Sequence, residues 1–216
     1  MRKFSWIINY LLKYKNYLTG EENIVKLTGL SNPGWSLGVD VKNTPFASRK
    51  YDSGLVEFSE HDWYDVFIKD KKLRAAGDTS KLSFLFSEFS RICSVSDADA
   101  SISDDKLLIE HLQWITRWHA KYCNVEWERE NLFKVNFTPS FEWNIYIDVL
   151  ETSLENILYS SGVQKISDDD WYTITIEKSI FTAAGDVTKL PFLLGEFRRL
   201  NELFGEDLTQ PRPTYE

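Results

Sequence analysis

The sequence predicts an α+β protein made of two tandem repeats, each an antiparallel β-meander of about five strands with an N-terminal and a C-terminal helix packed on it. Three observations lead to this prediction. The 216-residue chain repeats itself at half its length, and both ends of each repeat show helical spacing of apolar residues. Between those ends lie short runs of β-branched and aromatic residues, which are typical of strands.

The internal repeat has an offset of 108 residues and needs no gap. Trp63 corresponds to Trp171, and residues 59–92 are identical to residues 167–200 at 16 of 34 positions. Average residue usage would give about two identities by chance. The chain is therefore a tandem duplication.

The repeat sets the expected domain organisation. We expect a first unit at residues 1–93, a linker at 94–106 and a second unit with a C-terminal tail at 107–216. The linker is rich in Ser, Asp and Ala, as is typical of exposed connections. The sequence leaves open whether the two units pack as separate bodies or through a shared surface.

Each unit is expected to open and close with a helix. Apolar residues have helical spacing at 4–18, and the second unit repeats this pattern at 107–122. An amphipathic helix at 79–92 closes the first unit after a turn at Gly77. The strands between these helices are predicted at 24–30, 35–41, 46–51, 63–68 and 71–75.

The charge balance restricts the partners. The chain holds 25 Lys and Arg against 33 Asp and Glu, a net charge of −8, and the first 108 residues hold 15 of each sign. The whole net charge therefore belongs to the second unit. Nucleic-acid binders gain affinity from clustered basic residues, so this balance argues against direct nucleic-acid binding. Two explanations of the negative charge of the second unit stay open: it steers a basic partner, or it is a solvated acidic surface without a partner.

Cysteine usage and the N-terminus indicate a cytoplasmic protein. Cys93 and Cys123 form no C-x-x-C pair and no disulfide framework, which fits a reducing compartment. The apolar run at 4–12 is interrupted by Asn9 and Tyr10, and no small-residue cleavage site follows it. It predicts an amphipathic helix rather than a secretory signal, and we expect no membrane partner.

The repeated polar residues are explained better by structure than by catalysis. In Asp62-Trp63 the Asp is expected to tighten a turn and the Trp to pack in the core. Asp78 precedes a helix, but the phosphate-loop spacing is absent and a carboxylate repels anions, so we expect a helix cap. A small hydrolase that uses Asp62 and Asp78, or their copies, is the enzyme alternative.

The histidines disfavour a duplicated active site. His61, His111 and His119 do not recur at the offset of 108. His119 and Cys123 lie four residues apart on a predicted helix, close enough for two metal ligands or a Cys–His pair. No third ligand accompanies them, so we expect a surface histidine and a partly buried thiol. The sequence implies no metal and no organic cofactor, and we predict a protein without enzymatic activity.

Aromatic and acidic residues supply the candidate partner-binding surface. The chain has 8 Trp and 10 Tyr, residue types that anchor interfaces as well as cores. Acidic residues of the second unit cluster on both sides of Trp127 and directly before Trp171. The candidate partner-binding residues are Trp35, Glu126, Trp127, Glu128, Glu130, Asp168 and Asp169.

Several short motifs together carry a family resemblance. Residues 30–35 read LSNPGW, residues 123–128 read CNVEWE, and residues 59–63 and 167–171 both begin with Ser and end in Asp-Trp. An Ala-Gly turn and a closing helix follow in both copies. In these motifs the sequence resembles the immunity protein 53 family, small bacterial proteins encoded beside polymorphic toxins.

The resemblance implies an immunity protein that binds and neutralises a cognate toxin by occluding its active site. A toxin with a basic surface fits the acidic second unit, and a nuclease is one candidate because nucleic-acid-cleaving enzymes have basic grooves. The alternative is a non-enzymatic intracellular adaptor with two related binding units. The adaptor would bind two copies of a ligand, whereas a divergent pair of units would bind one toxin.

Overall fold

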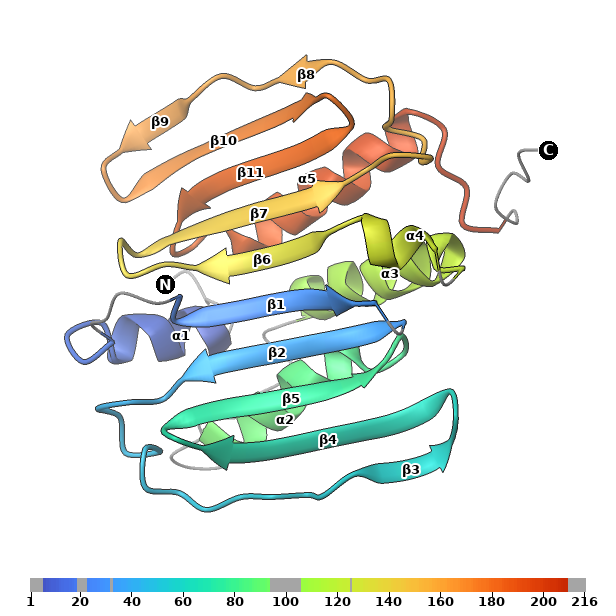
Figure 1. The fold of residues 1–216 in the computed structure, drawn as a ribbon. Coiled ribbons are helices and arrows are strands. Elements are labelled where there is room, and N and C mark those ends of the chain that lie inside the picture. The colour runs from blue at the N-terminus through green and yellow to red at the C-terminus, as the bar shows by residue number, and fades with distance from the viewer. Residues whose placement is uncertain (1–5, 19–22, 32, 94–105, 125, 210–216) are drawn as a thin grey trace.

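The computed structural model describes residues 6–18, 23–31, 33–93, 106–124 and 126–209. It shows an α+β fold in which two similar halves follow one another along the chain, as the sequence predicts (Figure 1). The expected linker at 94–106 lies outside the described residues, apart from Lys106.

The first half begins and ends with a helix. Its elements are α1 (Trp6–Lys13), β1 (Val25–Leu30), β2 (Gly34–Asp40), β3 (Val56–Ser59), β4 (Asp62–Lys69), β5 (Lys72–Asp78) and α2 (Leu82–Cys93). Helix α2 forms because Leu82, Leu85, Phe86 and Phe89 fall on one side of it at helical spacing, and all four are buried.

The second half repeats this order. Its elements are α3 (Lys106–Tyr122), α4 (Trp127–Glu130), β6 (Phe133–Phe137), β7 (Glu142–Asp148), β8 (Tyr159–Ser160), β9 (Gln164–Ser167), β10 (Asp170–Glu177), β11 (Ile180–Asp186) and α5 (Leu190–Leu203). In the part of the chain that the structure describes, no helix has the length and apolar character needed to cross a bilayer.

All the strands belong to one antiparallel sheet. Its order is β3-β4-β5-β2-β1-β6-β7-β11-β10-β8, and β9 also pairs with β10. Each half departs from an uninterrupted meander at one point: after β2 the chain passes to the outermost strand β3 and returns through β4 and β5 to β2. The described helices all lie on one face of the sheet, and the described residues place none on the other face (Figure 1).

Strands β1 and β6 join the two halves at the centre of the sheet. Val25 pairs with Phe137, and Leu27 pairs with Val135. The second pair is separated by the repeat offset, so Leu27 lies opposite its own counterpart and a pseudo-two-fold axis passes through the pair. The two units therefore do not pack as separate bodies: they form one sheet through the pairing of β1 with β6.

Tight hairpins fix the strand register in both halves. Asp70 and Lys71 connect β4 to β5 with φ angles of 53° and 60°. Lys178 and Ser179 connect β10 to β11 with φ angles of 52° and 58°. Two consecutive left-handed residues match the right-handed twist of the strands that they join, which explains why the same loop geometry recurs.

Strand residues alternate between the two faces of the sheet. In β2, Trp35, Leu37 and Val39 are buried beneath the helices, whereas Ser36 and Gly38 lie on the helix-free face. One continuous apolar core runs under both halves. The helix-free face is consequently the polar side of the whole sheet.

Three element predictions were wrong. Residues 46–51 form turns rather than a strand, and Phe46 is buried there. Strand β3 was missed because it is only 4 residues long and its residues are largely exposed. Gly77 lies inside β5 rather than in a turn, and a Cβ there would come within 2.8 Å of the Lys81 side chain.

Candidate partner-binding site

Trp35 belongs to the core and not to a surface. Its side chain is 0% exposed, and its Nε1 donates to the carbonyl oxygen of Thr79 at 3.0 Å. Its ring centroid lies 4.4 Å from that of His119 and 5.0 Å from that of Phe133. The corresponding Trp143 is buried to the same extent. Trp35 cannot touch a partner of the folded protein, so its place among the binding residues is corrected to a packing role.

The segment around α4 is also partly structural. Trp127 is 3% exposed, and its Nε1 donates to the carbonyl oxygen of Leu150 at 2.9 Å. Glu128 is buried and accepts a hydrogen bond from the backbone N–H of Asn124 at 2.9 Å. Both side chains hold α4 against the end of the sheet instead of facing solvent. The candidates of this segment that remain exposed are Glu126 and Glu130.

Asp168 and Asp169 lie exposed in the turn between β9 and β10. The Nζ of Lys165 lies 2.6 Å from Asp168 Oδ1, and this hydrogen bond lowers the pKa of Asp168. Asp168 therefore stays charged to a lower pH than an aspartate without this partner. The turn presents two adjacent carboxylates, with one nearby cation on the strand before them.

These two carboxylates line a cleft of about 390 Å³ at the end of the second half of the sheet. We call it the acidic cleft. It lies where β7, β10 and β11 meet α1 of the first half, so both halves contribute to it. Its principal side chains are Leu12, Lys15, Phe141, Glu142, Asp168, Asp169, Trp171, Asp186 and Thr188.

A hydrogen-bond network fixes one wall of the acidic cleft. Asp186 Oδ2 accepts the backbone N–H of Trp171 at 2.9 Å, and its Oδ1 accepts the N–H and hydroxyl of Thr188 at 2.9 and 2.6 Å. Lys189 forms an ion pair with Asp170 at the base of the same turn. Because the Asp186 carboxylate is engaged by these donors, the acidity offered to a ligand comes from the other carboxylates of the cleft.

The first half contains the same network. Asp78 accepts the backbone N–H of Trp63 at 2.9 Å and the hydroxyl of Ser80 at 2.6 Å. Burial acts to raise the pKa of Asp78, but these hydrogen bonds and the charge of Lys81 outweigh it and lower the pKa. The Nζ of Lys81 lies 2.6 Å from Asp62 Oδ1. These groups form hydrogen bonds and ion pairs with one another, so the network serves to hold the structure of the turn.

This network changes two expectations about the Asp-Trp pair. Asp62 pairs with Lys81, and the backbone N–H of Trp63 is accepted by Asp78 rather than by Asp62. Trp63 is half-buried on the helix-free face and not in the core. Its neighbour Tyr64 is the residue that faces α2, where its ring lies 4.6 Å from Phe84.

The two acidic clusters of the second half lie at opposite ends of the strands. Helix α4 directly precedes β6, whose first residue Phe133 pairs with Ile147 near the end of β7. Glu142 of the acidic cleft begins β7. At about 3.3 Å per residue the two ends are separated by roughly 20 Å. The fold therefore brings Asp168 and Asp169 together with Glu142 but leaves Glu126 and Glu130 apart from them.

Sequence reasoning missed Glu142 and did not assign Trp171 to the site. A signal for both was present in the comparison of the two copies. At the repeat offset Gly34 stands in place of Glu142 and His61 in place of Asp169, while the Trp is kept. The two copies thus keep the tryptophan but differ in charge at the positions around it. This difference indicates that the acidic cleft belongs to the second copy alone.

His119 differs from the expectation of a surface histidine. It is 2% exposed, and burial lowers its pKa to about 4. Its Nδ1 lies 3.2 Å from the sulfur of Cys123, so the two residues form a polar pair inside the protein. Among the described residues, no three His, Cys, Asp or Glu side chains are grouped closely enough to hold a metal ion.

The fold and this cleft define a duplicated α+β protein whose second half carries an acidic cleft. The family model for immunity protein 53 matches residues 4–94 and again residues 112–202. The chain belongs to the immunity protein 53 family and carries two tandem copies of its unit. Comparison with curated proteins and with solved structures gives no match. Membership gives the function in outline: this is an immunity protein, from a class of proteins that generally lack enzymatic activity.

Proposed function

We propose that the protein neutralises one cognate toxin by direct binding, with the acidic cleft placed over a basic groove of the toxin so that its active site is occluded. The observation that carries this proposal is the convergence of Glu142, Asp168 and Asp169 beside the Trp171 indole. Family membership supports the existence of a cognate toxin, and the charge of the cleft supports a basic contact surface on it.

The cleft suits a Lys or Arg side chain. Carboxylates pair with a cationic head group, and an indole attracts the same cation through its ring electrons. Among the described residues, Lys15 is the one basic residue that lines the cleft, and its Nζ lies 5.2 Å from the centroid of the Phe141 ring. The carboxylates therefore outnumber the cation, and the resulting potential would steer a basic surface during encounter.

A one-to-one complex follows from the difference between the copies. At the positions of Glu142, Asp168 and Asp169, the first copy has Gly34, Glu60 and His61. The cleft of the second copy is therefore not repeated with the same charge. A nuclease is the toxin class that best fits, because nucleic-acid-cleaving enzymes bind phosphates in basic grooves.

The test is co-expression with the toxin encoded beside the gene, combined with binding measurements at several salt concentrations. We expect the variant Asp168→Asn/Asp169→Asn to weaken toxin binding by roughly tenfold or more, to flatten its salt dependence and to reduce protection of growth. The matched control is Glu126→Gln/Glu130→Gln, which removes the same charge at the far end of the strands and should bind normally.

Equal behaviour of the two variants would overturn the cleft assignment while leaving the immunity function in place. Normal binding by Asp168→Asn/Asp169→Asn together with full toxin activity in the complex would argue against occlusion. Light scattering of the complex gives the stoichiometry directly.

A second candidate, the adaptor with two related binding units, is favoured by one observation. Exposed apolar residues recur at the same positions of both copies: Leu55 is 64% and Phe58 75% exposed, and their counterparts Val163 and Ile166 are 71% and 86% exposed. Repeated apolar surface of this kind marks contact sites. Two partner molecules per chain would favour this function over the capture of a single toxin.

A further inference from the structure

A row of residues across the helix-free face places two cations on either side of a glycine. Gly38 of β2 lies opposite Lys26 of β1 on one side and opposite Arg74 of β5 on the other. Residues directly opposite one another in a sheet share a face, so all three point away from the helices. Adjacent strands lie about 4.8 Å apart, which leaves a gap of roughly 10 Å between the two cationic residues with no side chain in it.

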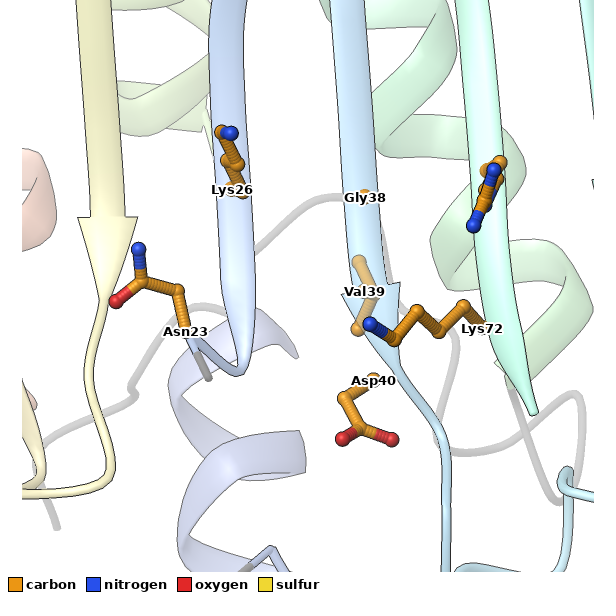
Figure 2. A pocket seen from close by; sticks show the side chains of 7 residues that line it. Asn23, Lys26, Gly38, Val39, Asp40 and Lys72 are labelled. Carbon is orange, nitrogen blue, oxygen red and sulfur yellow. The ribbon is translucent and has the colours of Figure 1, made fainter. Parts of the chain in front are cut away.

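This gap is part of a hollow of about 360 Å³. We call it the basic notch. Figure 2 shows Lys26 on one side of it, Lys72 reaching from β5 towards β2, and Asp40 at the end of β2. Asp40 lies directly opposite Lys72, and its Oδ1 also accepts the backbone N–H of Lys42 at 2.7 Å.

No described residue balances the charges of the two cations that flank the gap. Lys26 and Arg74 are both exposed, and within the described residues neither forms an ion pair. Lys72 lies two positions from Arg74 on the same face of β5, which places like charges roughly 7 Å apart. Lys72 itself lies opposite Asp40, so the cations of the notch that have no ion-pair partner among the described residues are Lys26 and Arg74.

The second copy shows that the fold does not need these residues. In the corresponding row, Lys134 pairs with Tyr146, and Tyr146 pairs with Thr182. At the repeat offset Tyr146 replaces Gly38, Thr182 replaces Arg74 and Ile180 replaces Lys72, so the row keeps a single cation, Lys134.

Gly38 is likewise not required by backbone geometry. A Cβ added there would meet only the backbone oxygen of Lys26, at 3.9 Å, which is an ordinary contact. The open space between the two cations therefore reflects the choice of residue and not a restriction of the sheet.

We propose that the basic notch is a docking site for an acidic segment of a partner protein, which places a carboxylate between Lys26 and Arg74. Arg74 can bind a carboxylate through two parallel hydrogen bonds, and Lys26 supplies a second positive charge from the opposite side. This surface is independent of the acidic cleft, and it makes the chain a binder with two sites of opposite charge.

A protein segment fits the notch better than a nucleic acid does. The chain has a net charge of −8, which repels a long polyanion, and Asp40 borders the hollow itself. A volume of about 360 Å³ accommodates a small number of side chains. Charge complementarity at one or two carboxylates is therefore the recognition that the notch can provide.

The test is a titration of the full-length, ¹⁵N-labelled protein with a glutamate-rich peptide, followed by amide shifts. The controls are the same peptide with glutamine in place of glutamate, a short DNA duplex and inorganic phosphate. We expect saturable shifts at Lys26, Gly38 and Arg74 with the glutamate peptide. Absence of these shifts, or equal shifts with the glutamine peptide, would overturn the proposal, as would tighter binding of the duplex or of phosphate.

Residues borrowed from the second copy make matched variants. Gly38→Tyr fills the gap, and Arg74→Thr removes one cation, and both should weaken peptide binding by roughly tenfold while the other amide signals stay unchanged. Arg117→Thr on the exposed side of α3 makes the same charge change away from the notch and should bind as the parent does. If Gly38→Tyr disturbs the fold, Arg74→Thr still decides the matter, and unchanged binding in Arg74→Thr contradicts the proposal.

Discussion

The imidazole ring of His119 packs against the indole ring of Trp35, with 4.4 Å between their centroids. The two residues come from different copies of the family unit, since Trp35 lies in β2 and His119 in α3. Phe133 of β6 closes the same cluster, with its ring centroid 5.0 Å from that of Trp35. The core of the first copy is thus completed by side chains of the second.

Gly29 makes room for this contact. A Cβ at Gly29 would lie 3.1 Å from His119 Nε2 and 3.4 Å from the Cβ of Phe133. We expect Gly29→Ala to destabilise the protein by about 1–3 kcal/mol, because the ring must move in a packed core. Urea unfolding measures the change, and Gly38→Ala is the control, since a Cβ there meets nothing nearer than 3.9 Å. Equal stability of both variants would contradict the tight packing.

The buried His119 predicts a loss of stability in mild acid. Burial lowers its pKa to about 4, whereas the ordinary value is 6.5. The unfolded chain therefore binds a proton between these values and the folded chain does not, so stability falls as the pH drops from about 6.5 to about 4. The shift corresponds to a loss on the order of 3 kcal/mol.

Thermal unfolding at a series of pH values, compared between variants, measures this effect. His119→Leu takes the residue found at the corresponding Leu11 and should remove most of the pH dependence in that window. His61→Leu, at an exposed position, should leave it unchanged. A parent protein whose stability stays constant from pH 6.5 to pH 4 would contradict the prediction.

The duplicated aspartate network predicts equal effects in both copies. Asp78→Ala and Asp186→Ala each leave the N–H of a tryptophan and of the following turn without an acceptor. Each variant should lose about 2–3 kcal/mol of stability in denaturant unfolding, since buried donors are left unsatisfied. Asp169→Ala, which lies exposed in a turn, serves as the neutral control. A variant that keeps its stability would reopen the catalytic interpretation of these aspartates.

The shared sheet predicts that the copies unfold together. Leu27→Asp and Val135→Asp each bury a charge at the central pair and should destabilise the whole chain by at least about 4 kcal/mol. Far-UV circular dichroism and tryptophan fluorescence should then report one coincident transition. Thr28→Asp, on the helix-free face opposite Lys134, should be tolerated. Two separate transitions would contradict a single cooperative unit.

Much of the fold is visible in the sequence because it is local or repeated. The offset of 108 residues predicts the second copy of each hydrogen bond around Asp78, and the helical spacing at both ends of each copy predicts α2, α3 and α5. The pairing of β1 with β6 was not predictable. A half-buried strand alternates in the same way whether its neighbour is solvent or another strand.

The candidate site was predicted in part, for a similar reason. Acidic residues and tryptophans were the right types to examine, but sequence does not separate a buried indole such as Trp127 from a half-buried one such as Trp171. The distance between the two acidic clusters depends on which end of a strand each occupies, and this is a property of the assembled sheet. Asp168 and Asp169 lie in the cleft because the strand register places the neighbouring Trp171 beside Asp186 and Glu142.

The pairing of β1 with β6 also has a consequence for association between molecules. Two separate sheets would expose four strand edges, whose unpaired N–H and C=O groups invite the strands of other chains. Joined through β1 and β6, the two sheets conceal two of these edges from other chains. The borders that remain are formed by β3, β8 and β9, which have 4, 2 and 4 residues. Such short borders offer little template for strand addition, so the joined sheet presents fewer places for it than two separate sheets would.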